Sequence, residues 1–119
     1  MASEHFIKNN DNWEELGAGV SRQFLGWDNQ IMMVKVKFQK GAVGTPHQHF
    51  HTQAAYVASG KFEFTVNGTT MIVSEGDGIY VSPNLIHGVV CLEEGVIVDT
   101  FSPVREDFLD GSAVSYFKK

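Results

Sequence analysis

The chain has 119 residues, 43% of them hydrophobic, and a formal net charge of -5. This length allows one domain with a complete hydrophobic core. The acidic balance, without any basic block, argues against nucleic acid or an anionic membrane as partner. A single cysteine, Cys91, excludes an internal disulfide, which is typical of cytoplasmic proteins. Residues 1–8 lack the apolar stretch of a signal peptide and no later segment is long and apolar enough to span a bilayer, so we expect a single cytoplasmic domain over residues 1–119.

Apolar residues recur at every second position along much of the chain, which is the period of half-buried β-strands. Ahead of these segments, we expect a helical turn at residues 13–16. The expected strands follow in chain order at residues 34–38, 62–66, 71–73, 79–81, 86–92 and 96–101. Many short strands at close and regular spacing favour an all-β sandwich or barrel.

Turn-forming residues separate the expected strands. Asn67-Gly68 predicts a two-residue type I′ hairpin turn between two runs of apolar residues. Further turns are expected at residues 76–78, at Pro83-Asn84 and at residues 93–95. After Pro103, residues 105–109 are expected to form a short C-terminal helix.

Four of the five histidines belong to one pattern: His47, His49 and His51 alternate, Gln53 follows them, and His87 lies far downstream. Because alternate residues of an extended strand point to one face, this run can present three imidazoles and an amide together. Imidazole is a common ligand of transition metals, so the pattern predicts a metal site that His87 completes from another strand. A bulge or twist would turn one side chain aside, so the spacing leaves four candidate ligands in the run. The alternatives are a solvated strand face for the run and a hydrogen-bonded histidine for His87.

Asp99 lies between apolar neighbours on an expected strand, on the same face as Phe101. A carboxylate is costly to bury unless it is paired or functional, so Asp99 is a candidate for chemistry. A structural pairing with an arginine or a backbone amide is the alternative. Arg105 follows within a few residues and suits bidentate recognition of a carboxylate. Because two acidic residues come directly after Arg105, a solvated surface ion pair is the alternative for it.

Two spaced motifs resemble those of the cupin superfamily. Residues 41–60 are similar to the first cupin motif and residues 76–87 to the second. The resemblance implies an all-β fold class, the cupin double-stranded β-helix or jelly-roll barrel, with a divalent transition metal in its mouth. The ligands that it implies are His47, His49, Gln53 and His87. It leaves His51 outside this set, and it does not choose among nickel, zinc, manganese and iron, all of which accept imidazole.

Gln53 stands where many cupins have glutamate. Three neutral imidazoles and an amide leave the charge of a divalent ion uncompensated, which makes the ion a stronger Lewis acid and favours an anionic substrate. The same ligands are less suited to oxygen chemistry, because a carboxylate ligand commonly stabilises oxidised iron. An acidic small molecule is therefore the expected partner of the site.

A narrower resemblance covers about residues 12–109. Residues 12–22, the histidine run and residues 99–108 are similar to the pectin-degradation cupins of the KdgF type. Those proteins act on the 4,5-unsaturated monouronates that pectate and alginate lyases release, and they accelerate ring opening to the linear 5-keto-4-deoxyuronate. The catalytic positions that the resemblance implies are Asp99, Phe101 and Arg105. Residues 110–119 lie outside the matched pattern and are expected to be a C-terminal tail.

In this interpretation Asp99 moves a proton as general acid and base, Arg105 holds the substrate carboxylate, and Phe101 packs on the sugar ring. The resemblance also implies a homodimer, which is common among cupins. The alternatives are a cupin dioxygenase or isomerase acting on another acidic small molecule, and a non-catalytic sugar-binding cupin. The absence of a helix-turn-helix segment counts against a transcription regulator.

Overall fold

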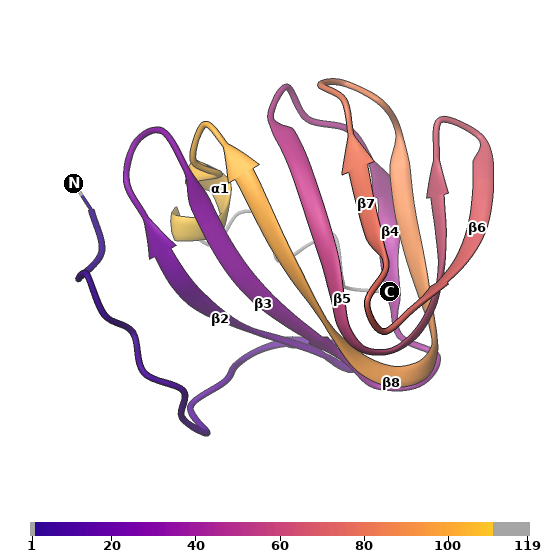
Figure 1. Ribbon diagram of the computed structural model, residues 1–119, viewed down its shortest axis with the longest axis horizontal. Helices are drawn as coiled ribbons and strands as arrows, with labels where there is room; N and C mark the ends of the chain where they lie inside the picture. The colour runs from indigo at the N-terminus through magenta and orange to yellow at the C-terminus, as the bar shows by residue number, and fades with distance from the viewer. Residues whose placement is uncertain (1, 111–119) are drawn as a thin grey trace.

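The computed structural model describes residues 2–110 as a β-barrel followed by one short helix (Figure 1). The strands are β1 (Glu14–Gly17), β2 (Val20–Trp27), β3 (Met32–Phe38), β4 (Val43–His47), β5 (Thr52–Val66), β6 (Thr69–Ser74), β7 (Gly78–Val81) and β8 (His87–Ser102), and the helix α1 spans Glu106–Asp110. No helix in this range is long and apolar enough to cross a membrane. The all-β prediction is confirmed, whereas the expected tail lies outside the described residues except for its first position.

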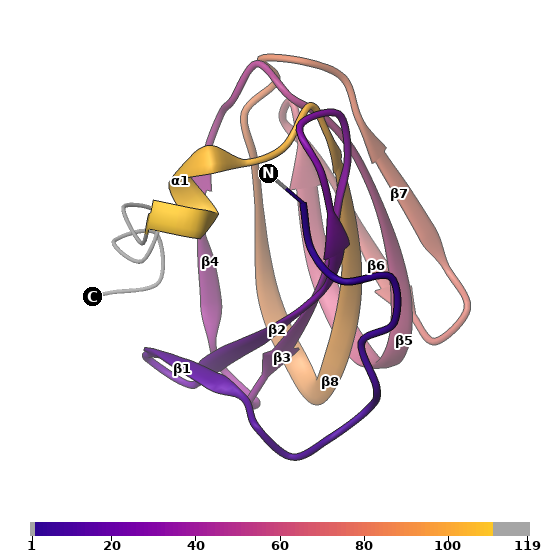
Figure 2. The same cartoon turned by 90° about the vertical axis from the view of Figure 1, so that its left-hand side faces the viewer.

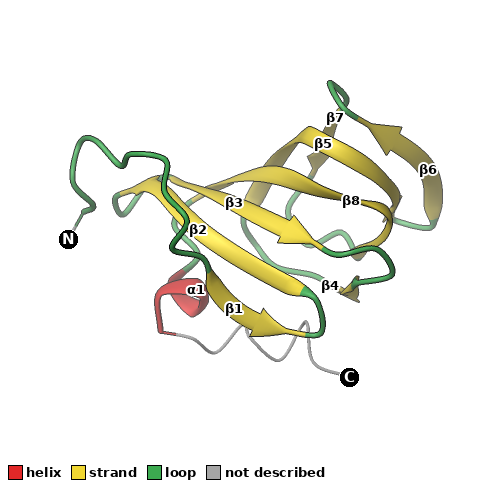
Figure 3. Ribbon diagram, turned by 90° about the horizontal axis from the view of Figure 1, so that it is seen from below, coloured by secondary structure: helices red, strands yellow, loops and turns green. Residues whose placement is uncertain are grey.

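The two longest strands, β5 and β8, run through the centre of the fold as an antiparallel pair. The first half of β5 and the second half of β8 pair with each other between β3 and β7, which gives a sheet in the order β1-β2-β3-β8-β5-β7. The remaining halves pair between β4 and β6 and form a second sheet. Figure 3 shows how the strands curl toward one another. This is the jelly-roll arrangement that the resemblance to cupins implied.

β5 and β8 bend together where two glycines meet. The turn expected at residues 93–95 is wrong, because β8 continues through this stretch and stays paired with β5, with shifts of register on the β5 side. Gly60 has a φ of 85°, and a Cβ added to it would lie 2.6 Å from a backbone carbonyl oxygen of β8. A Cβ on Gly95 would overlap the carbonyl of Ser59. The two glycines therefore allow a close crossing, and each long strand passes from one sheet into the other there.

Three local predictions can be compared with the structure. The Asn67-Gly68 hairpin is confirmed, because both residues have positive φ, 49° and 84°, and the strands on either side pair directly. The helix expected at residues 105–109 is confirmed, with bounds one residue later. The helical turn expected at residues 13–16 is wrong, since most of this segment forms β1 and pairs with β2.

The helix α1 lies behind β2, β3 and β8 in the view of Figure 1, and Figure 2 shows it beside these strands. Phe108 of α1 is buried, with its ring centroid 5.3 Å from that of Phe101 on β8. Arg22 on β2 is 2% exposed and donates a hydrogen bond from Nη2 to the Phe108 carbonyl oxygen at 3.0 Å. Its Nε donates to Glu14 Oε1 at 2.9 Å. These contacts fix α1 against the barrel and thereby position the residues just before it.

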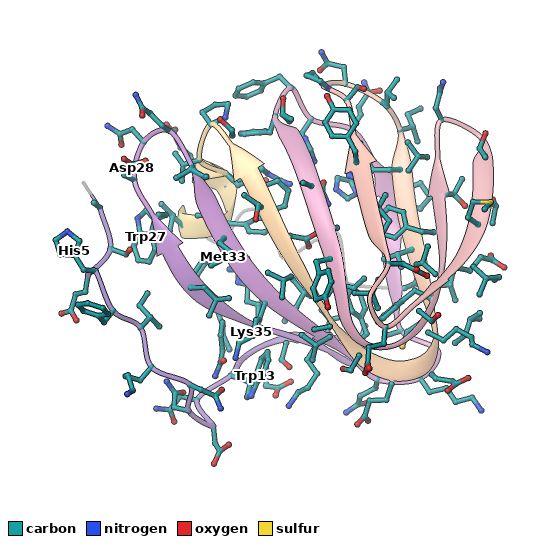
Figure 4. All side chains as sticks on the ribbon, in the orientation of Figure 1. His5, Trp13, Trp27, Asp28, Met33 and Lys35 are labelled. Atoms are coloured by element: carbon teal, nitrogen blue, oxygen red, sulfur yellow. The ribbon has the colours of Figure 1, made fainter. Side chains whose placement is uncertain are left out.

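Both tryptophans pack within the chain, Trp13 against two lysines and Trp27 against the hydrophobic core. The Trp13 ring lies beneath two lysine ammonium groups, at 4.3 Å from Lys37 Nζ and 5.2 Å from Lys35 Nζ, and Figure 4 shows Trp13 next to Lys35. Trp27 packs against Phe24 with ring centroids 5.6 Å apart. Phe24 also lies 5.0 Å from the guanidinium carbon of Arg22, which donates to the Phe108 carbonyl, so this aromatic pair adjoins the contact between β2 and α1.

Candidate metal centre

Three histidines meet where β4 ends and β8 begins. His47 is the last residue of β4 and His87 is the first of β8, and the two pair directly across the sheet. His49 lies in the loop between β4 and β5. The prediction that the histidine run forms one extended strand is therefore wrong, because the strand stops at His47 and the next begins at Thr52. The loop, and not the alternation of a strand, decides where His49 and His51 point.

The side chains of His47, His49 and His87 converge. One potential ligand nitrogen from each lies within 4.8 Å of the others. The ring centroids are 4.5 Å apart for His47 and His87, 4.8 Å for His49 and His87, and 5.7 Å for His47 and His49. Three nitrogens at this spacing are close enough to share one transition-metal ion, and these are the three histidines that the cupin resemblance implied.

Hydrogen bonds orient all three rings in the same sense. Each Nδ1 lies beside a backbone carbonyl oxygen, at 2.8 Å for His47, 3.1 Å for His49 and 2.9 Å for His87. A carbonyl can only accept, so each Nδ1 carries the proton and each Nε2 keeps its lone pair. Protein ligands to metals are commonly held this way. The Nε2 atom of His87 is buried and has no hydrogen-bond partner, which fits a metal ligand and is costly otherwise.

The three rings are neutral at neutral pH. Burial lowers the pKa of His47 and of His49 to about 4, and the nearby charge of Arg105 contributes to the lowering at His49. Burial also lowers the pKa of His87. A neutral imidazole is the form that binds a metal ion, so the site is ready for an ion without first losing protons.

Gln53, the fourth predicted ligand, adjoins the triad at the start of β5. Its Oε1 lies 3.1 Å from His49 Nε2, and its Nε2 donates to Asp99 Oδ1 at 3.0 Å. Because His49 Nε2 carries a lone pair, it and the amide oxygen are two acceptors that face each other. A cation between them would satisfy both, which is consistent with Gln53 as a ligand; that role stays a prediction.

Asp99 lines the same cavity as His47, His87 and Gln53. Burial raises the pKa of Asp99 to about 6, although the hydrogen bond from Gln53 and the charge of Arg105 oppose this rise. The strand face predicted for Asp99 is confirmed, since Phe101 on the same face of β8 lines this cavity too. A carboxyl group with such a pKa can both hold and release a proton near neutral pH.

Arg105 also lines this cavity and is 1% exposed, so it is not part of a solvated surface pair. Its guanidinium lies between two aromatic rings, 5.0 Å from the Phe101 centroid and 4.3 Å from that of Phe108. Nε and Nη2 donate to the two carboxylate oxygens of Asp107 at 2.8 and 2.6 Å. One of the guanidinium edges that suit a carboxylate, that of Nε and Nη2, is therefore occupied by a residue of the chain itself.

His51 stays outside the triad. Its ring is buried, stacks on Phe50 at a centroid distance of 4.0 Å, and has its Nε2 3.2 Å from the Val104 carbonyl oxygen. This bond ties the loop to the segment before α1. The sequence suggested an ion pair of Arg105 with the acidic residues after it only as a solvated surface pair. The structure shows that Asp107 makes this pair and that Arg105 is buried.

Known proteins resemble this chain over most of its length. Residues 34–101 match the cupin domain family. The pectin degradation protein KdgF of Dickeya dadantii (strain 3937) is 51% identical over 107 residues, which are 88% of this chain and 97% of the relative. The crystal structure of an RmlC-like cupin from Shewanella frigidimarina NCIMB 400 is 44% identical, with a TM-score of 0.87, covering 90% of this chain and 97% of that chain. The structure of KdgF from Halomonas sp. is 38% identical, with a TM-score of 0.83, covering 89% of this chain and 98% of that chain.

Proposed function

The chain belongs to the cupin family, and we propose that it is a metal-dependent enzyme that opens the ring of 4,5-unsaturated monouronates to linear 5-keto-4-deoxyuronate. Its similarity to a pectin degradation protein supports the substrate class. The observation that carries the proposal is the placement of Asp99, whose pKa is raised to about 6, in one cavity with two histidines of the triad. This arrangement sets a proton-transfer group beside a site for a Lewis acid.

His47, His49 and His87 would hold a divalent ion through Nε2, and Gln53 through Oε1. The residues fit such an ion because the buried His87 Nε2 has no partner and His49 Nε2 faces another acceptor. When bound, the ion supplies a Lewis acid that stabilises negative charge on the substrate oxygens. Nickel, zinc, manganese and iron all remain candidates, because each accepts imidazole.

The reaction is an isomerisation and needs no oxidant. A proton leaves the anomeric hydroxyl, the bond between the anomeric carbon and the ring oxygen breaks, and the anomeric carbon becomes an aldehyde. The electron pair left on the ring oxygen forms an enolate with the existing double bond, and a proton added to the neighbouring ring carbon gives the ketone. We assign both transfers to Asp99, which takes the proton from the hydroxyl oxygen and returns it to carbon. Its hydrogen bond from Gln53 leaves the second carboxylate oxygen for this work.

Arg105 attracts the acidic substrate by its charge. A bidentate grip on the substrate carboxylate through Nε and Nη2 would require Asp107 to be displaced, so the proposed contact involves the rest of the guanidinium. Phe101 lines the cavity but is only 2% exposed, which limits its contact with a sugar ring. Its proposed contribution is therefore also to hold the Arg105 guanidinium, 5.0 Å from its ring centroid.

The direct test adds the zinc-loaded or nickel-loaded protein to unsaturated monouronate freshly released by a lyase. The ultraviolet absorbance of the double bond is followed against spontaneous decay. We expect faster decay, and a return to the spontaneous rate after treatment with a chelator. Equal rates with and without the metal-loaded protein would refute the proposal and leave the sugar-binding alternative, whereas oxygen uptake with ferrous iron would favour a dioxygenase. The homodimer and the cytoplasmic location stay predictions.

A further inference from the structure

Asp107 makes the shortest ion pair among the described residues. Its two carboxylate oxygens accept from Arg105 Nε at 2.8 Å and Nη2 at 2.6 Å, whereas the ion pairs of Arg22 and Lys61 measure 2.9 and 3.3 Å. Two parallel hydrogen bonds of this kind fix the plane and the direction of a guanidinium as well as its distance. Asp107 therefore determines how Arg105 lies in the cavity wall.

The surroundings of Arg105 make this contact necessary. The residue is 1% exposed, and aromatic rings lie near its guanidinium at 5.0 Å (Phe101) and 4.3 Å (Phe108). Rings at the faces of the group accept no conventional hydrogen bond, so its N–H donors need partners in their own plane. A buried charge that loses its partner is strongly unfavourable. Asp107, whose side chain is 27% exposed, supplies acceptors for two of these donors, Nε and Nη2, from the first turn of α1.

The charge of Arg105 also acts on the triad. Arg105 lines one cavity with His47 and His87 and a neighbouring one with His49, so its positive charge lies close to all three rings. The same field would repel a divalent ion bound by these rings. Asp107 lines a neighbouring hollow together with His49 and Arg105, so its negative charge acts on the triad in the opposite sense. Asp107 thus offsets, near the triad, the repulsion that Arg105 creates.

We propose that Asp107 is a positioning residue for Arg105 and that its charge allows the triad and Arg105 to hold a divalent ion and an acidic substrate side by side. The claim about metal binding stands on the triad alone, whereas the claim about the substrate rests on the proposed function. The two claims can be tested separately. Metal binding needs a negative charge at position 107, whereas substrate binding needs the bidentate hydrogen bonds to Arg105 Nε and Nη2.

The test compares Asp107→Asn with Glu106→Gln in the full chain. Both remove one negative charge from α1, but the Glu106 side chain is exposed, so it is the matched control. Zinc affinity of the metal-free protein is measured by competition with a chromophoric chelator. We expect Asp107→Asn to bind zinc roughly tenfold more weakly and Glu106→Gln to match the wild type. Equal affinity for Asp107→Asn and wild type, or an equal loss in both variants, would overturn the charge claim.

Asp107→Glu keeps the charge but moves the carboxylate by one methylene, and it serves also if Asp107→Asn does not fold. We expect wild-type zinc affinity and a KM for unsaturated monouronate raised roughly tenfold, with a smaller change in kcat. A weakened zinc affinity in this variant would contradict the charge claim, and an unchanged KM would contradict the positioning claim. If the wild type itself does not convert the sugar, the proposed function fails, and the zinc comparison still decides whether Asp107 compensates Arg105.

Discussion

Replacing Gln53 with glutamate tests why the cavity contains an amide. The substitution Gln53→Glu keeps the size of the side chain and its oxygen near His49, but it exchanges the N–H donor to Asp99 for a second carboxylate oxygen. We expect zinc to bind at least as tightly as in the wild type, because a carboxylate compensates the charge of the ion. We expect ring opening to be nearly lost, because Asp99 loses its hydrogen bond and gains a like-charged neighbour.

The magnitude follows from the distance. Gln53 Nε2 lies 3.0 Å from Asp99 Oδ1, and two unit charges at such a separation repel by roughly 5 kcal/mol at an effective dielectric constant of about 20. The pair will therefore share a proton, as neighbouring carboxyls do, and Asp99 will no longer accept one freely. General acid–base catalysis commonly contributes about 100- to 10,000-fold to a rate, so we expect kcat to fall by at least about 100-fold.

The assay combines zinc competition with the decay of the double-bond absorbance. Gln48→Glu is the matched control, because it makes the same chemical change at an exposed residue between two of the triad histidines, and it should retain most of the activity. Thermal unfolding with and without zinc shows that each variant is folded and loaded. A zinc-loaded Gln53→Glu variant with wild-type kcat would refute the reasoning, since the amide would then matter neither for Asp99 nor for the charge of the site.

Three further predictions follow from single contacts. Asp99→Asn should lower kcat by about 100-fold or more with zinc affinity retained, and an unchanged rate would remove Asp99 from the mechanism. His87→Ala should abolish tight zinc binding, whereas His51→Ala, which loses the hydrogen bond to the Val104 carbonyl and the ring contacts with Phe50 and His49, should bind zinc normally; similar zinc affinities for both variants would contradict the assignment of ligands. Gly95→Ala places a Cβ against the Ser59 carbonyl and should lower the free energy of unfolding by about 3 kcal/mol, measured with urea. An unchanged urea midpoint would show that the β5–β8 crossing relaxes easily.

The strands that the sequence predicted are marked either by alternating burial or by a recognisable turn beside them. β3 alternates strictly between buried and less buried residues, and β6 follows a hairpin turn of a recognisable type. β2 was not predicted, because its first three residues are all buried and so do not alternate between the two faces: Val20, Ser21 and Arg22. The alternation is broken by Arg22, which is buried and donates hydrogen bonds to Glu14 and to the Phe108 carbonyl. Such burial depends on α1, which lies far away in the sequence.

The ligand triad could be predicted from motif spacing, but its geometry could not. The alternation of histidines suggested a strand, whereas a loop separates His49 from β4 and sends the neighbouring His51 toward Val104. Arg105 was equally hard to place, because two adjacent acidic residues resemble an exposed charged turn. Its burial arises from Phe101 on β8 and Phe108 on α1, which close on the guanidinium only in the folded chain. Long-range packing, which no local pattern records, decided both cases.

The charges around the cavity explain what the amide at position 53 achieves. The triad histidines are neutral, Gln53 adds no charge, and Asp107 balances Arg105 through their ion pair. Among the residues that line the cavity in the described part of the chain, Asp99 is the one acid. A divalent ion in the triad would thus keep a net positive charge even when Asp99 is ionised, and the carboxylate of a uronate would neutralise it. A glutamate at position 53 would let the protein neutralise the ion by itself, and the site would lose its electrostatic preference for an acidic sugar.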